Sequence, residues 1–97
     1  MKKVILSADG DKSLYSVPDK VAEQLKRFCL EFDYWMMDTP EGQRYWNGQG
    51  YCYTEADFID WLNEVRFPEE TSRRIAVLGD FDSAIPEEYR DLPYFNF

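Results

Sequence analysis

Histidine is absent from this chain of 97 residues. It is the side chain most often used for proton transfer near neutral pH, so its absence excludes Ser-His-Asp and Cys-His catalytic sites. Two cysteines without histidine also cannot supply the usual ligand set of a structural zinc site. We therefore expect that the protein is not an enzyme and that it folds without a cofactor or metal.

Basic residues and long apolar runs are also scarce. Lysine and arginine total 11, against 19 aspartates and glutamates, whereas contact with nucleic-acid phosphates needs a basic surface. No stretch approaches the roughly 18 apolar residues of a membrane-spanning helix. The apolar run Val4-Ile5-Leu6 is too short for the core of a signal peptide. We expect a cytoplasmic protein that contacts neither membrane nor nucleic acid directly.

The only two cysteines, Cys29 and Cys52, fall in an expected helix and an expected strand, each among aromatic residues. A disulfide scaffold of this size normally carries more pairs. We interpret both cysteines as buried free thiols of a reducing compartment. A single bridge between them is the alternative.

What the chain does have is an uneven charge and many aromatic residues. Residues 1–30 carry six basic and four acidic side chains, whereas residues 31–97 carry five and fifteen. Seventeen aromatic residues and a hydrophobic content of 44% are enough for a buried core. The length suits one domain over residues 1–97.

The spacing of apolar residues predicts the secondary structure. Residues 3–8 and 13–17 are β-prone and flank the pair Asp9-Gly10, a pattern typical of a β-hairpin. A main core helix follows Pro18, with Asp19 in its first turn. Its apolar stripe is Val21, Leu25, Phe28, Cys29, Phe32, Trp35 and Met36.

A second helix is expected over residues 55–66. Thr54 and Asp57 resemble a capping box, and Pro68 marks the end of the helix. Residues 38–50 are expected to be a loop with one helical turn, and another turn should follow Pro86. Residues 51–53 look like a short strand, whereas residues 75–78 fit a strand or the last turn of a helix equally well. Together these elements predict an α+β fold, in which a small antiparallel sheet seeded by the N-terminal hairpin packs against two amphipathic helices.

Two carboxylate patterns suggest metal binding, and both are better interpreted as turns. Asp9 and Asp11 begin like a calcium loop, but Leu14 and Lys20 occupy the positions that need glycine and glutamate. Asp80 and Asp82 have a spacing that can chelate magnesium or manganese, without any phosphate loop to support it. A small carboxylate-dependent or metal-assisted enzyme using this pair is the least favoured function.

Acidic and aromatic residues of the second half are the candidate partner-binding groups. Complementary charge steers association, and aromatic residues dominate contact energies. The acidic side chains follow the second helix, and the aromatic ones lie in a glycine-rich loop and the C-terminal tail: Asp57, Asp60, Glu64, Glu69, Glu70, Tyr45, Trp46, Tyr94 and Phe95. A solvated helix face, and a tail packed as a strap over the core, are the simpler interpretations of the same residues.

Three segments carry a resemblance to a known family: Asp9 to Asp19, Cys52 to Ile59, and Pro86 to Arg90 with Phe95-Asn96-Phe97. In these segments the chain resembles a family of small uncharacterised proteins from anaerobic gut bacteria. The resemblance spans nearly the whole chain and implies a bacterial, cytoplasmic origin. It implies no activity and no functional residue.

The hypothesis that follows is an acidic, non-catalytic module that binds another protein with a basic surface. The alternative is a nucleic-acid mimic that blocks a DNA- or RNA-binding protein, which would need carboxylates repeated over an extended surface. Homodimerisation is a further expectation, because small aromatic-rich domains often cover an exposed patch by symmetric pairing.

Overall fold

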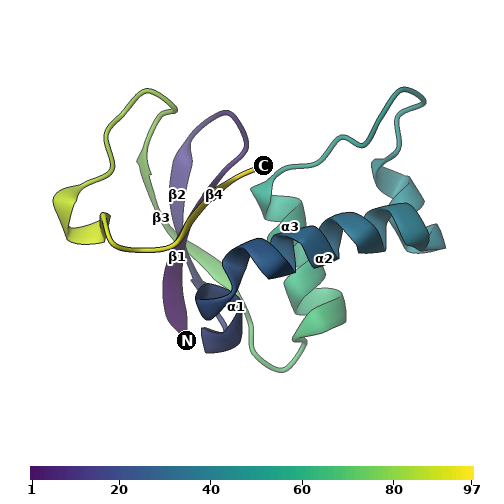
Figure 1. The fold of residues 1–97 in the computed structure, drawn as a ribbon, viewed down its shortest axis with the longest axis horizontal. Coiled ribbons are helices and arrows are strands. Elements are labelled where there is room, and N and C mark those ends of the chain that lie inside the picture. Colours follow the sequence, from purple (N-terminus) through teal and green to yellow (C-terminus); the bar gives the residue numbers. More distant parts are fainter.

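The computed structural model describes residues 1–97 and contains one four-stranded sheet with the order β3-β2-β1-β4 (Figure 1). The strands are β1 (Lys2–Ser7), β2 (Lys12–Val17), β3 (Arg73–Gly79) and β4 (Tyr94–Asn96). The predicted α+β fold, with its N-terminal hairpin and two helices, is confirmed. The sheet is mixed rather than antiparallel, because β4 pairs with β1 in parallel.

The hairpin forms where the alternating pattern and Asp9-Gly10 predicted it. Its register runs from Lys2 opposite Val17 to Leu6 opposite Ser13. Asp9, rather than the glycine, takes the left-handed conformation, with φ of 53°. Asn96 of β4 supports this turn, because its Oδ1 accepts from the Asp9 N–H at 2.8 Å and its Nδ2 donates to Asp9 Oδ1 at 2.9 Å.

Residues 75–78, which periodicity could not assign, belong to strand β3. This strand pairs antiparallel with β2, with two register irregularities. Asn63 fixes the start of β3 by exchanging two hydrogen bonds with the backbone of Ser72, at 2.7 and 2.9 Å. The expected strand over residues 51–53 is wrong. Tyr51 makes only an isolated bridge with Trp46, and the Tyr53 ring packs on Phe32 in the core.

The first helical region is broken in two, which corrects the single helix expected after Pro18. Helix α1 spans Asp19–Glu23 and α2 spans Leu25–Asp38. Gln24 between them has φ of −135° and ψ of 45°, outside the helical region. The break turns the chain between α1 beside β1 and the long α2 (Figure 1).

The remaining helical segments agree with the sequence-based expectation. A 3₁₀ helix, η1, spans Pro40–Tyr45, and η3 spans Glu87–Tyr89. Helix α3 spans Glu55–Trp61 and continues as the π-helical turn η2, Leu62–Arg66, which confirms a helix over residues 55–66. Its predicted cap is also present, since Asp57 Oδ2 accepts from the Thr54 N–H at 2.9 Å.

The core lies between the helices and one face of the sheet. Alternation along β1 and β2 directs Val4, Leu6, Tyr15 and Val17 toward α2 and α3. Phe32 is the centre of the aromatic packing on the helical side, with five ring neighbours: Trp35, Tyr45, Tyr53, Phe58 and Trp61. The opposite face of the sheet buries Ile5 and Leu14, on the side where residues 80–93 cross (Figure 1).

Both cysteines are free thiols, as expected, but they differ in burial. Cys29 is buried in α2, whereas Cys52 is exposed, which corrects the expectation that both are buried. Cys52 lies in extended chain just after the Trp46–Tyr51 bridge, where no second layer covers it. None of the helices combines the length and the apolar character needed to span a bilayer.

Candidate functional site

Helix α3 and η2 carry three carboxylates on one face, where Asp60 and Glu64 are exposed and Asp57 is half-buried. Asp57, Asp60 and Glu64 are spaced three and four residues apart, which places them one above another on the helix. Partial burial raises the pKa of Asp60 above its ordinary value, and the neighbouring charges of Glu64 and Asp57 raise it further. The three groups therefore repel one another in the ionised state.

Arg44 of η1 is the cation that the structure brings to this face. Its Nη2 lies 3.6 Å from Glu64 Oε2, and it also donates to the Tyr45 hydroxyl at 2.7 Å. The guanidinium lies over the Tyr45 ring at 4.9 Å, so that the side chain is held in place. One arginine against three carboxylates leaves the face negative, and Arg44 links it to the loop that follows η1.

That loop carries an exposed tryptophan. Trp46 is 48% exposed and packs edge-to-face on Tyr51 at 5.2 Å. The turn between them is held by Asn47, whose Oδ1 accepts from the N–H groups of Gln49 and Gly50, both at 2.9 Å. We call Asp57, Asp60, Glu64 and Arg44, together with Trp46 two residues after Arg44 in the chain, the acidic–aromatic surface.

Three other predicted partner-binding residues do not contribute to this surface. Tyr45 is buried, with its ring edge-on to Phe32, so it cannot offer its ring to a partner. Glu69 and Glu70 are exposed in the turn after η2, beside a shallow hollow of about 190 Å³. Neither glutamate is among the charges that perturb Asp60.

The aromatic tail is packed into the fold, which confirms the interpretation of a strap. Tyr94 and Phe95 belong to β4, and the Tyr94 hydroxyl lies 2.8 Å from Ser7 Oγ. Phe95 packs on Phe97 at 4.8 Å, and Phe97 in turn packs on Phe58 at 5.3 Å. Tyr94 is 37% exposed but is tied to the sheet, so the tail is not a free anchor.

The two carboxylate pairs considered as metal sites are parts of turns. Asp80 Oδ1 accepts hydrogen bonds from the N–H groups of Asp82 and Ser83 and from Ser83 Oγ, at 2.8 to 3.1 Å. The hydrogen bonds from Ser83 lower the pKa of Asp80 below its ordinary value. Asp9 binds Asn96 in the hairpin turn. The chain contains no group of three or more side chains arranged to hold a metal ion.

One polar pair was missed by the sequence analysis. The Tyr53 hydroxyl donates to Asp33 Oδ1 at 3.1 Å, beside a hollow of about 210 Å³ lined also by Met36, Met37 and Tyr51. Burial raises the pKa of Asp33, and burial together with the Asp33 charge raises the pKa of Tyr53 to about 12. Twenty residues separate the pair in the sequence, so no local spacing signals it.

An apolar stripe on α2 was also missed. Leu30, Tyr34 and Met37 are 44%, 60% and 49% exposed and follow the i, i+4, i+7 spacing of one helix face. Their spacing can be read from the sequence, but the exposure of the three side chains is known only from the structure.

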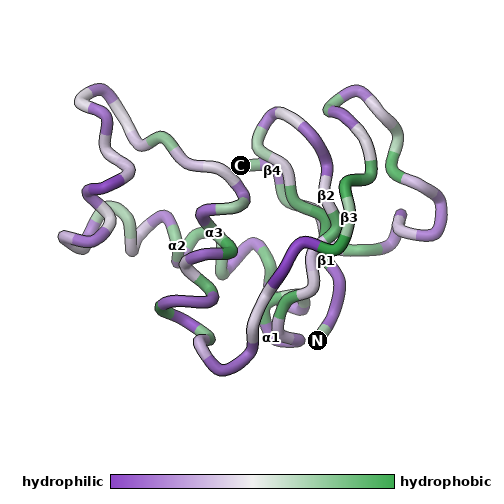
Figure 2. Tube along the Cα trace, turned by 180° about the vertical axis from the view of Figure 1, so that it is seen from behind, coloured by the Kyte–Doolittle hydropathy of each residue, from purple (hydrophilic) through white to green (hydrophobic).

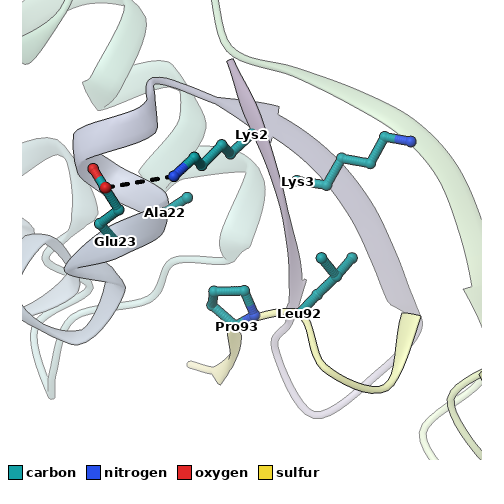
Figure 3. A pocket seen from close by; sticks show the side chains of 6 residues that line it. All are labelled: Lys2, Lys3, Ala22, Glu23, Leu92 and Pro93. Carbon is teal, nitrogen blue, oxygen red and sulfur yellow. Dashed lines mark hydrogen bonds and ion pairs between the residues drawn. The ribbon is translucent and has the colours of Figure 1, made fainter. Parts of the chain in front are cut away.

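The largest hollow lies between α1, β1 and the segment before β4, with a volume of about 510 Å³ (Figure 3). Lys2 reaches toward Glu23, at 3.4 Å, whereas Lys3 points the other way. The rest of its lining is Ala22, Leu92 and Pro93.

Comparison with known protein families, with curated proteins and with solved structures finds no match for this chain.

Proposed function

We propose that this protein is a small, non-catalytic cytoplasmic module that binds a basic surface of another protein through its acidic–aromatic surface. The observation that carries the proposal is the cluster of Asp57, Asp60 and Glu64, in which mutual repulsion contributes to the raised pKa of Asp60. Such a cluster costs stability in the free protein, and a cationic partner would relieve that cost.

Trp46 adds the apolar contact that charge alone does not supply. A half-exposed tryptophan held by Tyr51 and a hydrogen-bonded turn loses little conformational freedom on binding. Tryptophan is also enriched among the residues that dominate binding energies. The carboxylates can steer a basic partner, and Trp46, two residues after Arg44 in the chain, can supply an apolar anchor.

The extent of the surface favours a protein partner over nucleic-acid mimicry. Asp57 to Glu64 covers seven residue steps, or about 10 Å of helix at roughly 1.5 Å per residue. Arg44 lies within the same face. A basic protein patch can match so small a cluster, whereas a mimic needs a longer array of carboxylates.

The test is affinity capture from a lysate of the host with the wild-type protein and two charge-matched double variants. Asp60→Asn/Glu64→Gln removes two charges from the surface, and Glu69→Gln/Glu70→Gln removes two charges outside it. We leave Asp57 intact because it caps α3. A protein retained by the wild type and the control, but lost with the surface variant and with Trp46→Ala, supports the proposal. Equal retention by both double variants, or no specific retention, contradicts it.

A further inference from the structure

Strand β3 is a free edge of the sheet. It pairs with β2 on one side only, and none of its main-chain groups hydrogen-bonds to a segment outside the sheet. Its first five residues, 73–77, are all exposed, including Ile75 at 45% and Val77 at 51%. Unpaired backbone groups beside exposed apolar side chains are a template for pairing with another strand.

The charges of β3 are arranged in opposite signs at its two ends. Arg73 and Arg74 begin the strand, and neither forms an ion pair within the chain, whose four ion pairs involve other residues. Asp80 and Asp82 follow its end. Figure 2 shows the hydrophilic start of β3 and the hydrophobic remainder. An antiparallel copy would place the arginines beside the aspartates, whereas a parallel copy would place like charges together.

Strand β3 is therefore complementary to β3 of a second copy in the antiparallel orientation. This is the orientation that a two-fold axis between the two copies generates. A two-fold axis makes each contact occur twice, so that both arginine pairs would gain acidic neighbours. Ile75 of one copy would lie near Val77 of the other. The opposite edge of the sheet, β4, is less suited to pairing with another strand, because β4 has only three residues and its side chains bind Ser7 and Asp9.

We propose that the protein forms a homodimer in which β3 pairs antiparallel with β3 of a second copy about Ala76, giving one continuous eight-stranded sheet. The two register irregularities increase the local twist of β3, which keeps the paired segment short. Stable interfaces bury about 1,200 to 2,000 Å² in total, and one short strand pair contributes less, so the dimer is weak and concentration-dependent. This dimer does not depend on the proposed function.

Sedimentation velocity over a range of protein concentrations tests the proposal. The wild type is expected to shift from monomer to dimer as concentration rises. Arg73→Glu/Arg74→Glu should weaken the dimer by about tenfold or more, since it replaces two attractive contacts on each side by repulsive ones. Lys26→Glu/Arg27→Glu makes the same charge change on α2 and should leave the dimer unchanged.

A cross-link tests the register. In a Cys52→Ser background, Ala76→Cys should give a disulfide-linked dimer under mild oxidation, because residues at a two-fold axis of paired strands lie within disulfide reach. Leu30→Cys, on the exposed stripe of α2, should not. The proposal would be overturned if the wild type stayed monomeric at all concentrations. It would also be overturned if Lys26→Glu/Arg27→Glu weakened the dimer and Arg73→Glu/Arg74→Glu did not, or if only Leu30→Cys gave a cross-link.

Discussion

Asp60 is a residue whose charge opposes folding. Its pKa is raised in the folded protein, so the ionised carboxylate destabilises the fold above that pKa, and protonation relieves the cost as pH falls through it. Asp60→Asn should therefore raise the free energy of unfolding at neutral pH. We expect a gain below about 1 kcal/mol, because the group is exposed and screened.

Denaturant unfolding at a series of pH values checks this expectation. The gain in the free energy of unfolding of Asp60→Asn should be largest at neutral pH. It should shrink as the pH falls toward the ordinary pKa of aspartate, where Asp60 of the folded wild type is also uncharged. Glu69→Gln removes one charge outside the cluster and should show a smaller gain. A gain that is independent of pH would contradict the repulsion inferred among these carboxylates.

Gly42 is the glycine that the packing requires. A Cβ atom at this position would overlap the backbone of Met36, because η1 folds back onto α2 through the Thr39 cap. Gly42→Ala should lower the free energy of unfolding by about 1 to 3 kcal/mol, the usual cost of overpacking. Gly50→Ala is the matched control, since no atom lies within 4 Å of its Cβ position. Equal stability of the two variants would contradict this packing.

At the residue scale, local signals were predictable and distant contacts were not. The Thr54–Asp57 cap was predicted because both partners lie within one helical turn. The Asp33–Tyr53 hydrogen bond and the burial of Tyr45 depend on how η1 folds against α2, which no nearby residue encodes. Cys52 has aromatic neighbours in the sequence, yet it lies where no layer covers it.

At the element scale, Asn96 is the side chain of β4 that binds the hairpin turn. Asn96 both accepts from the Asp9 N–H and donates to Asp9 Oδ1, whereas an aspartate could not donate. Asn96→Asp places two carboxylates together and should lower the free energy of unfolding by about 1 to 2 kcal/mol.

Amide hydrogen exchange locates this effect. The Ile5 and Phe97 N–H groups, which bond to Pro93 and Ser7 across the β1–β4 contact, should lose protection first in Asn96→Asp. The amides of α2 are the internal reference and should change little. Uniform loss of protection across both elements would show that β4 is not a separate opening unit.

Elements with their own boundary signals were placed correctly by the sequence, and elements defined by tertiary contacts were not. The hairpin and α3 have turn and cap residues. The break at Gln24 has neither glycine nor proline, and the apolar spacing continues across it, so periodicity predicts one helix. Residues 51–53 have the alternating pattern of a strand, but the rings of Tyr51 and Tyr53 pack against the aromatic core instead.

At the scale of the whole molecule, the uneven charge of the chain has a structural counterpart. The first 30 residues, which carry the net positive charge, supply β1, β2 and α1, whereas the acidic remainder supplies α3 and the turns around it. Composition predicted the imbalance. It did not predict that Arg73 and Arg74 would lie on the free edge of the sheet, because residues 73–79 could be assigned to a strand only through their pairing with β2.

The parallel pairing of β1 with β4 also determines the order in which the chain can fold. The hairpin can close within microseconds, since its strands are neighbours in the sequence. The β1–β4 contact must instead close a loop that contains nearly all other residues, and that entropy cost delays it. The transition state is therefore expected to contain the hairpin and helices without β4. Changes in the last strand should accelerate unfolding while leaving the folding rate almost unaltered.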